Sequence, residues 1–209
     1  MHTPLRHRVI QPRILYFGTP VALLSTLQPD GSANLSPFSS VWALDDRLVC
    51  GLGLLGQGLA NLERTREAVV NLPSPGLWAQ VERLGPTTGR DPVPEEKREM
   101  GYRFEPRKFE RAGLTPLPSD TVGPPRVAEC PLQLEARLLA VQMSAMTAEQ
   151  SAPGFAIAEL QVTRVHAHED ITVPGTHHVD PERWGPLLYV FRRYVGGGVS
   201  LGRNFRAEQ

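Results

Sequence analysis

The sequence predicts a mainly β, antiparallel fold, and three patterns support that prediction. Residues 21–24 form an apolar run of strand length that does not continue at helical spacing. Residues 29–31 (Pro-Asp-Gly) follow closely and have the composition of a turn that reverses a strand. Residues 130–142 and 154–166 interleave apolar with polar positions, as strands with one buried face do. We therefore expect a barrel of about six antiparallel strands with a few peripheral helices.

The next predicted element is a buried strand that leads into a helix. The apolar residues from Leu48 onward are interrupted by Gly56 and Gly58, and the helix that follows carries Gln57 and Asn61 in its first turn. A helix N-terminus offers unpaired amides and the positive end of the helix dipole, and glycine lets a ligand approach the backbone. This pattern is typical of an anion site. It is not a Rossmann motif, because the repeated βαβ pattern of that fold is missing.

The chain continues with a short strand over residues 67–72 and then leaves the predicted barrel. Ser74 and Pro75 favour a helix start, and two further short helices follow, each with a proline near its beginning. We expect a helical excursion over about residues 74–113. Residues 114–129 are proline-rich and predict an extended arm that returns the chain to the last two strands.

Length and charge favour one domain over residues 1–209 and exclude several classes of protein. The 22 Lys and Arg balance the 22 Asp and Glu without a basic block, so a nucleic-acid or anionic-membrane partner is not expected. Residues 1–8 lack the apolar segment of a signal peptide, and no apolar run reaches the roughly 18 residues of a membrane helix. We expect a cytoplasmic protein in which Cys50 and Cys130 are buried free thiols.

A dense set of small polar side chains follows the first hairpin. Asn34, Ser36, Ser39 and Ser40 lie close together and are bent by Pro37. Two interpretations stay open for this segment. It is either a serine-rich loop that satisfies its own backbone, or the polar rim of a site for a flat, phosphate-bearing cofactor. The neighbouring strand-to-helix anion site favours the second interpretation.

Several segments together resemble the flavin reductase-like family. The matching segments are Ser25-Thr26 before the Pro-Asp-Gly turn, residues 34–40, the turn before residues 59–62, residues 69–72, and shorter matches in family order as far as residues 186–189. The resemblance covers almost the whole chain. Members of this family are FMN-binding split β-barrels and include NAD(P)H:flavin oxidoreductases and flavoredoxin. The resemblance therefore implies an antiparallel split β-barrel that binds FMN.

The resemblance also implies which residues hold the cofactor. The strand end at Ser25 and Thr26 and the loop over residues 34–40 would line the flavin ring and ribityl chain, and the turn over residues 56–61 would approach the phosphate. The implied FMN-binding residues are Ser25, Thr26, Asn34, Pro37, Phe38, Ser39, Ser40, Gly56, Gln57, Gly58, Asn61 and Asn71. The protein would be an oxidoreductase that uses NAD(P)H or a protein reductant on flavin or a small acceptor. It would form a homodimer with the flavin near the interface.

Two departures from the family pattern leave alternatives open. Residues 54–58 (Leu-Leu-Gly-Gln-Gly) lack the lysine or hydroxyl expected at the phosphate turn, so Arg64 or an arginine from elsewhere would supply the charge. Residues 150–156 lack the Gly-Asp-His that serves the pyridine nucleotide. One alternative is therefore a non-catalytic FMN carrier or electron-transfer module. The other is a cofactor-free split-barrel interaction protein.

Histidines near the C-terminus supply weak candidates for catalysis. His177 and His178 are considered as a proton donor or substrate contact, because histidine titrates near neutral pH. His166 and His168 would share one face of a strand and could both reach a metal ion. This spacing alone is a weak signal, and the resembled family often has a histidine at the position of His166 without a metal. We expect no metal site.

Overall fold

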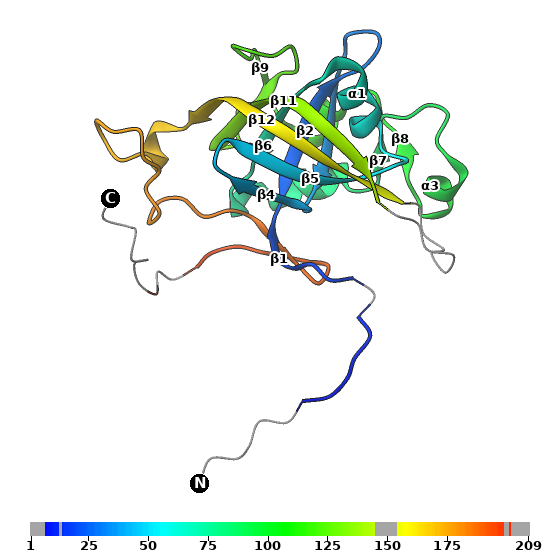
Figure 1. Ribbon diagram of the computed structural model, residues 1–209, viewed down its shortest axis with the longest axis horizontal. Coiled ribbons are helices and arrows are strands. Elements are labelled where there is room, and N and C mark those ends of the chain that lie inside the picture. The colour runs from blue at the N-terminus through cyan, green and yellow to red at the C-terminus, as the bar shows by residue number, and fades with distance from the viewer. Residues whose placement is uncertain (1–6, 13, 145–153, 199–200, 202–209) are drawn as a thin grey trace.

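The chain folds around one large antiparallel sheet, which confirms the predicted fold class (Figure 1). The computed structural model describes residues 7–12, 14–144, 154–198 and 201. Each strand of this sheet runs antiparallel to its neighbours. In order across the sheet, the seven strands are β3 (Ala33–Phe38), β2 (Ala22–Leu27), β6 (Glu67–Leu72), β11 (Leu132–Met143), β12 (Phe155–Ala167), β5 (Arg47–Gly53) and β4 (Val41–Leu44).

The two edge strands of this sheet, β3 and β4, are consecutive in the chain and are joined only by Ser39 and Ser40. Seven strands spaced by about 4.8 Å would place the edges of a flat sheet roughly 29 Å apart. Two linking residues reach only about 10 Å. The sheet must therefore curl until its edges approach each other. A backbone hydrogen bond of 2.7 Å from the amide of Gly51 to the carbonyl of Ser40 fixes the link against β5.

Strand β2 is buried on both faces and separates two apolar clusters. Ala22 and Leu24 pack inside the curled sheet with residues of β5, β12 and helix α1 (Gln57–Thr65). Val21 and Leu23 point the other way, into a second cluster beneath the excursion. Full burial of one such side chain contributes about 1.5–3 kcal/mol. The two clusters therefore hold the sheet, α1 and the excursion together along β2.

The helical excursion expected from the sequence is built from short elements that cover β3. They are η1 (Pro75–Leu77), α2 (Trp78–Leu84), β7 (Thr87–Thr88), α3 (Glu95–Glu99), β8 (Arg103–Phe104) and α4 (Lys108–Ala112). Helices α2 and α4 contact each other and β3. A parallel pairing between β7 and β8, which the sequence pattern did not predict, closes the excursion into a loop that carries α3. Figure 1 shows α3 at the right of the molecule, beyond α1.

The remaining short strands lie outside the large sheet. β9 (Pro116–Leu117) and β10 (Arg126–Val127) pair within the extended arm, and η2 (Glu169–Ile171) follows β12. β1 (Phe17–Pro20) pairs with β13 (Leu188–Val190), and β13 pairs with β14 (Arg193–Val195) in a small sheet below the large one in Figure 1. Among the described residues, no helix has the length and apolar character needed to span a membrane.

Candidate functional site

A cavity of about 320 Å³ lies where the N-terminus of α1 meets the end of β3 and the excursion. Most of its lining comes from three parts of the chain: residues 36–38 of β3, residues 51–59 from β5 to the start of α1, and residues of the excursion that include Lys97 and Lys108. Leu24 of β2 and Gly154 complete it. We call it the α1 cavity. Its size is within the range of pockets that bind small molecules.

The first turn of α1 presents unpaired backbone amides. The helix begins after Gly56, an extended N-cap residue that has no side chain to cap the helix, and its first turn contains no acidic residue. The first N–H groups of a helix have no acceptor within the helix, and the helix dipole places partial positive charge there. Gln57 and Gly58, which begin the helix, both line the cavity. This end of the cavity is therefore suited to an anion.

Glycine and apolar residues shape the rest of the wall. A Cβ atom on Gly58 would lie 3.2 Å from Oγ of Ser36 and 3.3 Å from a methyl of Leu24, so glycine lets α1 lie close against β2 and β3. Pro37 and Phe38, at the end of β3, add an apolar surface to the lining. The cavity thus combines an apolar wall with a positively polarised end.

The positive side chains of this cavity come from the excursion and were missed by the sequence analysis. Lys108 is 2 % exposed, and among the described residues it has no hydrogen-bond or ion-pair partner. Burial, together with the nearby charge of Lys97, lowers the pKa of Lys108 to about 7 against an opposing effect of Glu105. Burial and Arg90 also lower the pKa of Lys97, whose Nζ lies 4.8 Å from the ring centre of Tyr102. Arg64, the cation considered from the sequence, instead donates to the carbonyl of Leu27.

A network of amide and hydroxyl groups lies behind the cavity wall. Nε2 of Gln57 donates to Oδ1 of Asn61 at 2.9 Å, and Nδ2 of Asn61 donates to Oγ1 of Thr26 at 3.1 Å. Nδ2 of Asn34 donates to the same Thr26 oxygen at 3.3 Å and to Oγ of Ser36 at 3.1 Å. Thr26, Asn34 and Asn61 are at most 1 % exposed. The structure therefore places these three residues as supports of Gln57 and Ser36, which line the cavity.

The loop between β3 and β4 belongs to a second, apolar cleft. Oγ of Ser40 lies 2.9 Å from the hydroxyl of Tyr16, and Ser40 and Trp42 line a volume of about 620 Å³ beside β1. We call it the Trp42 cleft. Gly51 lines both the cleft and the α1 cavity. Ser39 is half-buried and lines neither space.

Asn71 and Ser25, like Ser39 and Ser40, do not line the α1 cavity. Nδ2 of Asn71 donates to the carbonyl of Leu23 at 3.1 Å, and its Oδ1 accepts a 2.8 Å hydrogen bond from the amide of Val127. Asn71 thus fastens the extended arm to the sheet. Ser25 is fully buried, and its hydroxyl has no polar partner in the part of the chain that the structure describes.

The histidines also lie apart from the α1 cavity. His177 and His178 are exposed in the loop after η2, which Figure 1 shows on the side of the molecule opposite α3. His166 and His168 do not converge on one point, because Nε2 of His166 lies 2.7 Å from Glu135 and Nε2 of His168 lies 2.9 Å from the carbonyl of Ala128. The sequence analysis compared residues 150–156 with the Gly-Asp-His segment of the family. Of these, residues 150–153 lie outside the described residues.

Glu135 is a fully buried carboxylate that holds the arm against β11. It accepts hydrogen bonds of 2.8 Å from the amide of Asp120, and of 2.6 Å from both the amide and the hydroxyl of Thr121. Burial alone would raise the pKa of Glu135, but hydrogen bonds from Thr121, Asp120 and His166 lower it to about 2. Ligand atoms of Asp120, Glu135 and His166 lie within 4.8 Å of one another. Because the oxygens of Glu135 already accept protein hydrogen bonds, this cluster is explained by its structural role.

Comparison of the sequence with known proteins identifies one family along most of the chain. A family model described as "Flavin reductase like domain" matches residues 14–198. The uncharacterized protein YdfE of Bacillus subtilis (strain 168) is 43% identical over 203 residues, which cover 97% of this chain and 95% of the relative.

Solved structures with the same fold agree with the family match. The flavoredoxin of Desulfovibrio vulgaris (Miyazaki F) superposes with a TM-score of 0.74 at 19% identity, over 98% of this chain and 100% of that chain. Nitrilotriacetate monooxygenase component B from Bacillus cereus superposes with a TM-score of 0.72 at 18% identity, over 92% of this chain and 89% of that chain. At 18–19% identity, these two superpositions show a shared fold and nothing further.

Proposed function

Because this chain belongs to the flavin reductase-like family, we propose that it is an FMN-dependent oxidoreductase whose flavin binds in the α1 cavity. The observation that carries the proposal is the combination, in one cavity, of an uncapped helix N-terminus with an apolar wall. A flavin ring is flat and largely apolar, while its phosphate is an anion. The two walls of the cavity therefore suit the two ends of FMN.

The residues around the cavity would act by positioning the cofactor. Phe38 and Pro37 offer an apolar surface for the ring, and the amides of Gln57 and Gly58 are placed for the phosphate. Asn61 holds the side chain of Gln57 in place from behind. The chemistry that bound FMN would supply is two-electron transfer between a nicotinamide donor and an acceptor. The chain itself binds and orients the cofactor and limits the access of water.

We propose NAD(P)H as the electron donor and flavin or another small molecule as the acceptor. The donor must reach the flavin ring from the open side of the α1 cavity. The Trp42 cleft shares Gly51 with the lining of the cavity, and its apolar surface would serve this approach. His177 and His178 line neither the cavity nor the cleft, so we assign them no role in this proposal.

A homodimer is proposed as the functional unit. The outward faces of β4 and β12 expose Trp42, Leu44, Phe155 and Ile157, which is an apolar surface of the kind that marks interaction sites. Trp42 and Ile157 also line the Trp42 cleft, which shares Gly51 with the lining of the α1 cavity. Dimerisation over this face would bring a second subunit close to the flavin. We also propose a cytoplasmic protein, with which the free, buried Cys50 and Cys130 are consistent.

The experiment that tests this function is an absorption spectrum of the purified protein, followed by assays of NADH and NADPH oxidation with added FMN. A yellow protein that oxidises either nucleotide supports the reductase. A yellow protein that oxidises neither supports the alternative of an FMN carrier or electron-transfer module. A colourless protein whose melting temperature does not change with excess FMN supports the cofactor-free alternative, because ligand at a hundred times its Kd should stabilise by roughly 2.7 kcal/mol.

A further inference from the structure

Lys108 is a buried amine on the wall of the α1 cavity, and the proposed function gives it no role. It begins α4, is 2 % exposed and lines the cavity together with Lys97 of α3. These two residues are the only lysines of the chain. Among the described residues, Lys108 has no hydrogen-bond or ion-pair partner. Within that part of the chain, its amine is therefore available to a ligand in the cavity.

The surroundings of Lys108 favour the neutral form of its amine. Burial and the nearby charge of Lys97 lower the pKa of Lys108 to about 7, against an opposing effect of Glu105. Glu105 accepts a 2.9 Å hydrogen bond from the amide of Arg107 and, within the described residues, forms no ion pair with Lys108. An ordinary lysine has a pKa of about 10.4 and is almost fully protonated at pH 7. A large share of the Lys108 amine is instead neutral there, and therefore nucleophilic.

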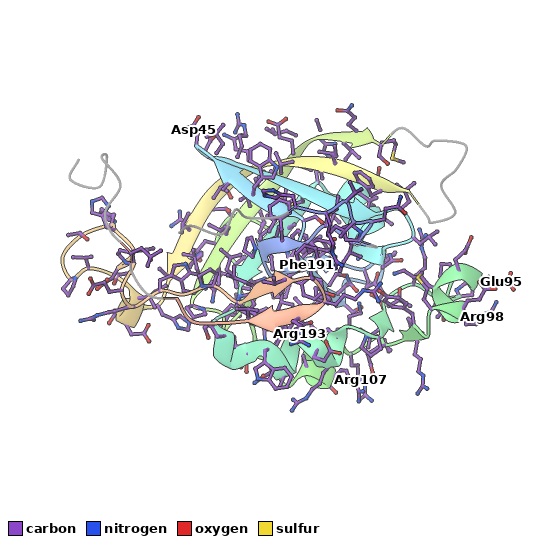
Figure 2. The ribbon with its side chains drawn as sticks, turned by 90° about the horizontal axis from the view of Figure 1, so that it is seen from below. Asp45, Glu95, Arg98, Arg107, Phe191 and Arg193 are labelled. Atoms are coloured by element: carbon purple, nitrogen blue, oxygen red, sulfur yellow. The ribbon has the colours of Figure 1, made fainter. Side chains whose placement is uncertain are left out.

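Two arginines of the excursion are placed differently. Arg98 pairs with Glu95 at 3.9 Å and Arg107 pairs with Glu110 at 3.2 Å, and all four side chains are well exposed. Figure 2 shows Glu95 and Arg98 at the outer end of α3, directed away from the sheet. A guanidinium group also keeps its proton at any pH near neutrality, whereas a lysine amine can lose it when buried. Lys108 thus differs from these arginines in both its surroundings and its chemistry.

A desolvated lysine amine beside a second cation is the arrangement that forms Schiff bases with carbonyl compounds. The Nζ atom of Lys108 would add its electron pair to the carbonyl carbon. The carbonyl oxygen would take up the two protons of the amine and leave as water, so that a C=N bond replaces the C=O bond. This exchange needs no oxidant or reductant, and water reverses it.

We propose that Lys108 is a nucleophilic amine that binds an α-oxo acid as a Schiff base, and that Lys97 stabilises the carboxylate of this ligand. The carboxylate is bonded directly to the reacting carbon, which places it close to Lys108, where the charge of Lys97 acts. Within the described residues, the cavity lining contains no aspartate or glutamate that would repel it. This activity goes beyond the proposed function and does not rest on it, since an oxo acid and FMN would compete for the α1 cavity.

The test is reductive trapping of the wild type with glyoxylate, the smallest α-oxo acid, and cyanoborohydride at pH 7. A trapped Schiff base leaves a carboxymethyl group on the amine, which peptide mass spectrometry assigns to Lys108, to Lys97 or to the α-amino group. We expect Lys108 to be labelled about tenfold faster than Lys97, because each unit of pKa changes the neutral fraction of an amine about tenfold. Labelling of Lys108 should also saturate with glyoxylate. Slower labelling of Lys108 than of Lys97, or a rate that rises without saturation, overturns the inference.

Substitutions in α3 test the role of Lys97 in labelling Lys108. Lys97→Met should slow the labelling of Lys108 about threefold to tenfold, whereas Lys97→Arg keeps the charge and should stay within about twofold of the wild type. Arg98→Met removes a charge from the same helix outside the cavity and should leave the rate unchanged. If Lys97→Met labels as fast as the wild type, or if Arg98→Met slows labelling as much, the role of Lys97 is wrong.

Labelling with and without FMN keeps this inference distinct from the proposed function. If FMN binds and Lys108 is not labelled in its absence, the flavin site stands and this inference is wrong. If Lys108 is labelled and added FMN does not slow the labelling, this inference stands and FMN does not bind in the α1 cavity. Because the wild type alone gives these results, a variant that fails to fold does not affect them.

Discussion

The side-chain amide of Gln57 donates a 2.9 Å hydrogen bond to Oδ1 of Asn61. This bond ties a residue of the cavity wall to a polar group that is only 1 % exposed. Asn61 in turn donates to Thr26 and to Gln28, so that α1 is joined to β2 and to the residue that follows it. The geometry of the cavity therefore depends on a buried polar network as much as on the residues that line it.

Asn61→Ala should destabilise the protein and weaken FMN binding together. The substitution removes a buried hydrogen bond to Thr26 and a partly buried one to Gln28, and it frees the Gln57 side chain, at a cost of about 1–3 kcal/mol. Urea unfolding and an FMN titration measure the two effects. Glu63→Ala, on the exposed face of the same helix, should change neither. Equal stability of Asn61→Ala and the wild type would show that the network contributes little.

Gly89→Ala should destabilise the junction between the excursion and β3. A Cβ atom at this position would collide with Oδ1 of the buried Asn34 and would lie 3.0 Å from Nε2 of Gln28. Forcing these side chains apart should cost about 1–3 kcal/mol in urea unfolding. Gly53→Ala is the matched control, because a Cβ atom there meets nothing within 4 Å. If both variants unfold at the same urea concentration, Asn34 is free to move and the packing argument fails.

Lys108→Met should stabilise the protein in the absence of an anion. Because burial lowers the pKa of Lys108 from 10.5 to about 7, the unfolded chain binds more protons than the folded one between these pH values. The free energy of unfolding of the wild type therefore increases as the pH rises from about 7 toward 10.5. The variant lacks this increase. The difference in free energy of unfolding between Lys108→Met and the wild type should be largest below pH 7, with an upper bound of about 5 kcal/mol.

Urea unfolding across this pH range, in buffers without phosphate, measures the effect. The variant should be more stable than the wild type at pH 6.5, and the two should converge toward pH 10. A variant that is less stable at every pH would mean that Lys108 has a stabilising partner in the folded protein. That result would remove the basis for an unpaired cation in the cavity.

Glu135→Gln should lower stability at neutral pH and flatten the acid side of the stability profile. The folded pKa of Glu135, about 2, lies below its ordinary value of 4.5. Its contribution is therefore fully present above about pH 4.5 and is lost as pH falls toward 2, and it amounts to about 3 kcal/mol. Urea unfolding between pH 2 and 7 checks this, with the exposed Glu63→Gln as control. If the stability of Glu135→Gln and of the wild type falls equally steeply between pH 4.5 and 2, the lowered pKa of Glu135 is contradicted.

Local patterns were sufficient to predict the longer strands of the large sheet and the start of α1. The hairpin between β2 and β3 and the glycine turn before Gln57 depend on neighbouring residues, so the sequence carries their signal directly. The family and the mainly β fold predicted from the sequence are confirmed by the family match and by the sheet itself. The contacts that polar side chains make at the strand ends could not be predicted in the same way.

The roles of individual amides and cations depend on contacts that are distant in sequence. Asn71 was expected at the cofactor, but whether its amide faces a ligand or the backbone of Val127, 56 residues away, is decided by the path of the arm. Lys97 and Lys108 reach the α1 cavity only because β7 pairs with β8 and α4 packs on β3. The one available sequence signal was that these are the only lysines of an arginine-rich chain.

The central claim is that FMN binds in the α1 cavity, and a crystal structure of the protein grown with FMN tests it most directly. We expect the ring against Phe38 and the phosphate on the amides of Gln57 and Gly58. Density for FMN only in the Trp42 cleft, or no FMN density at saturating concentration, would contradict the account.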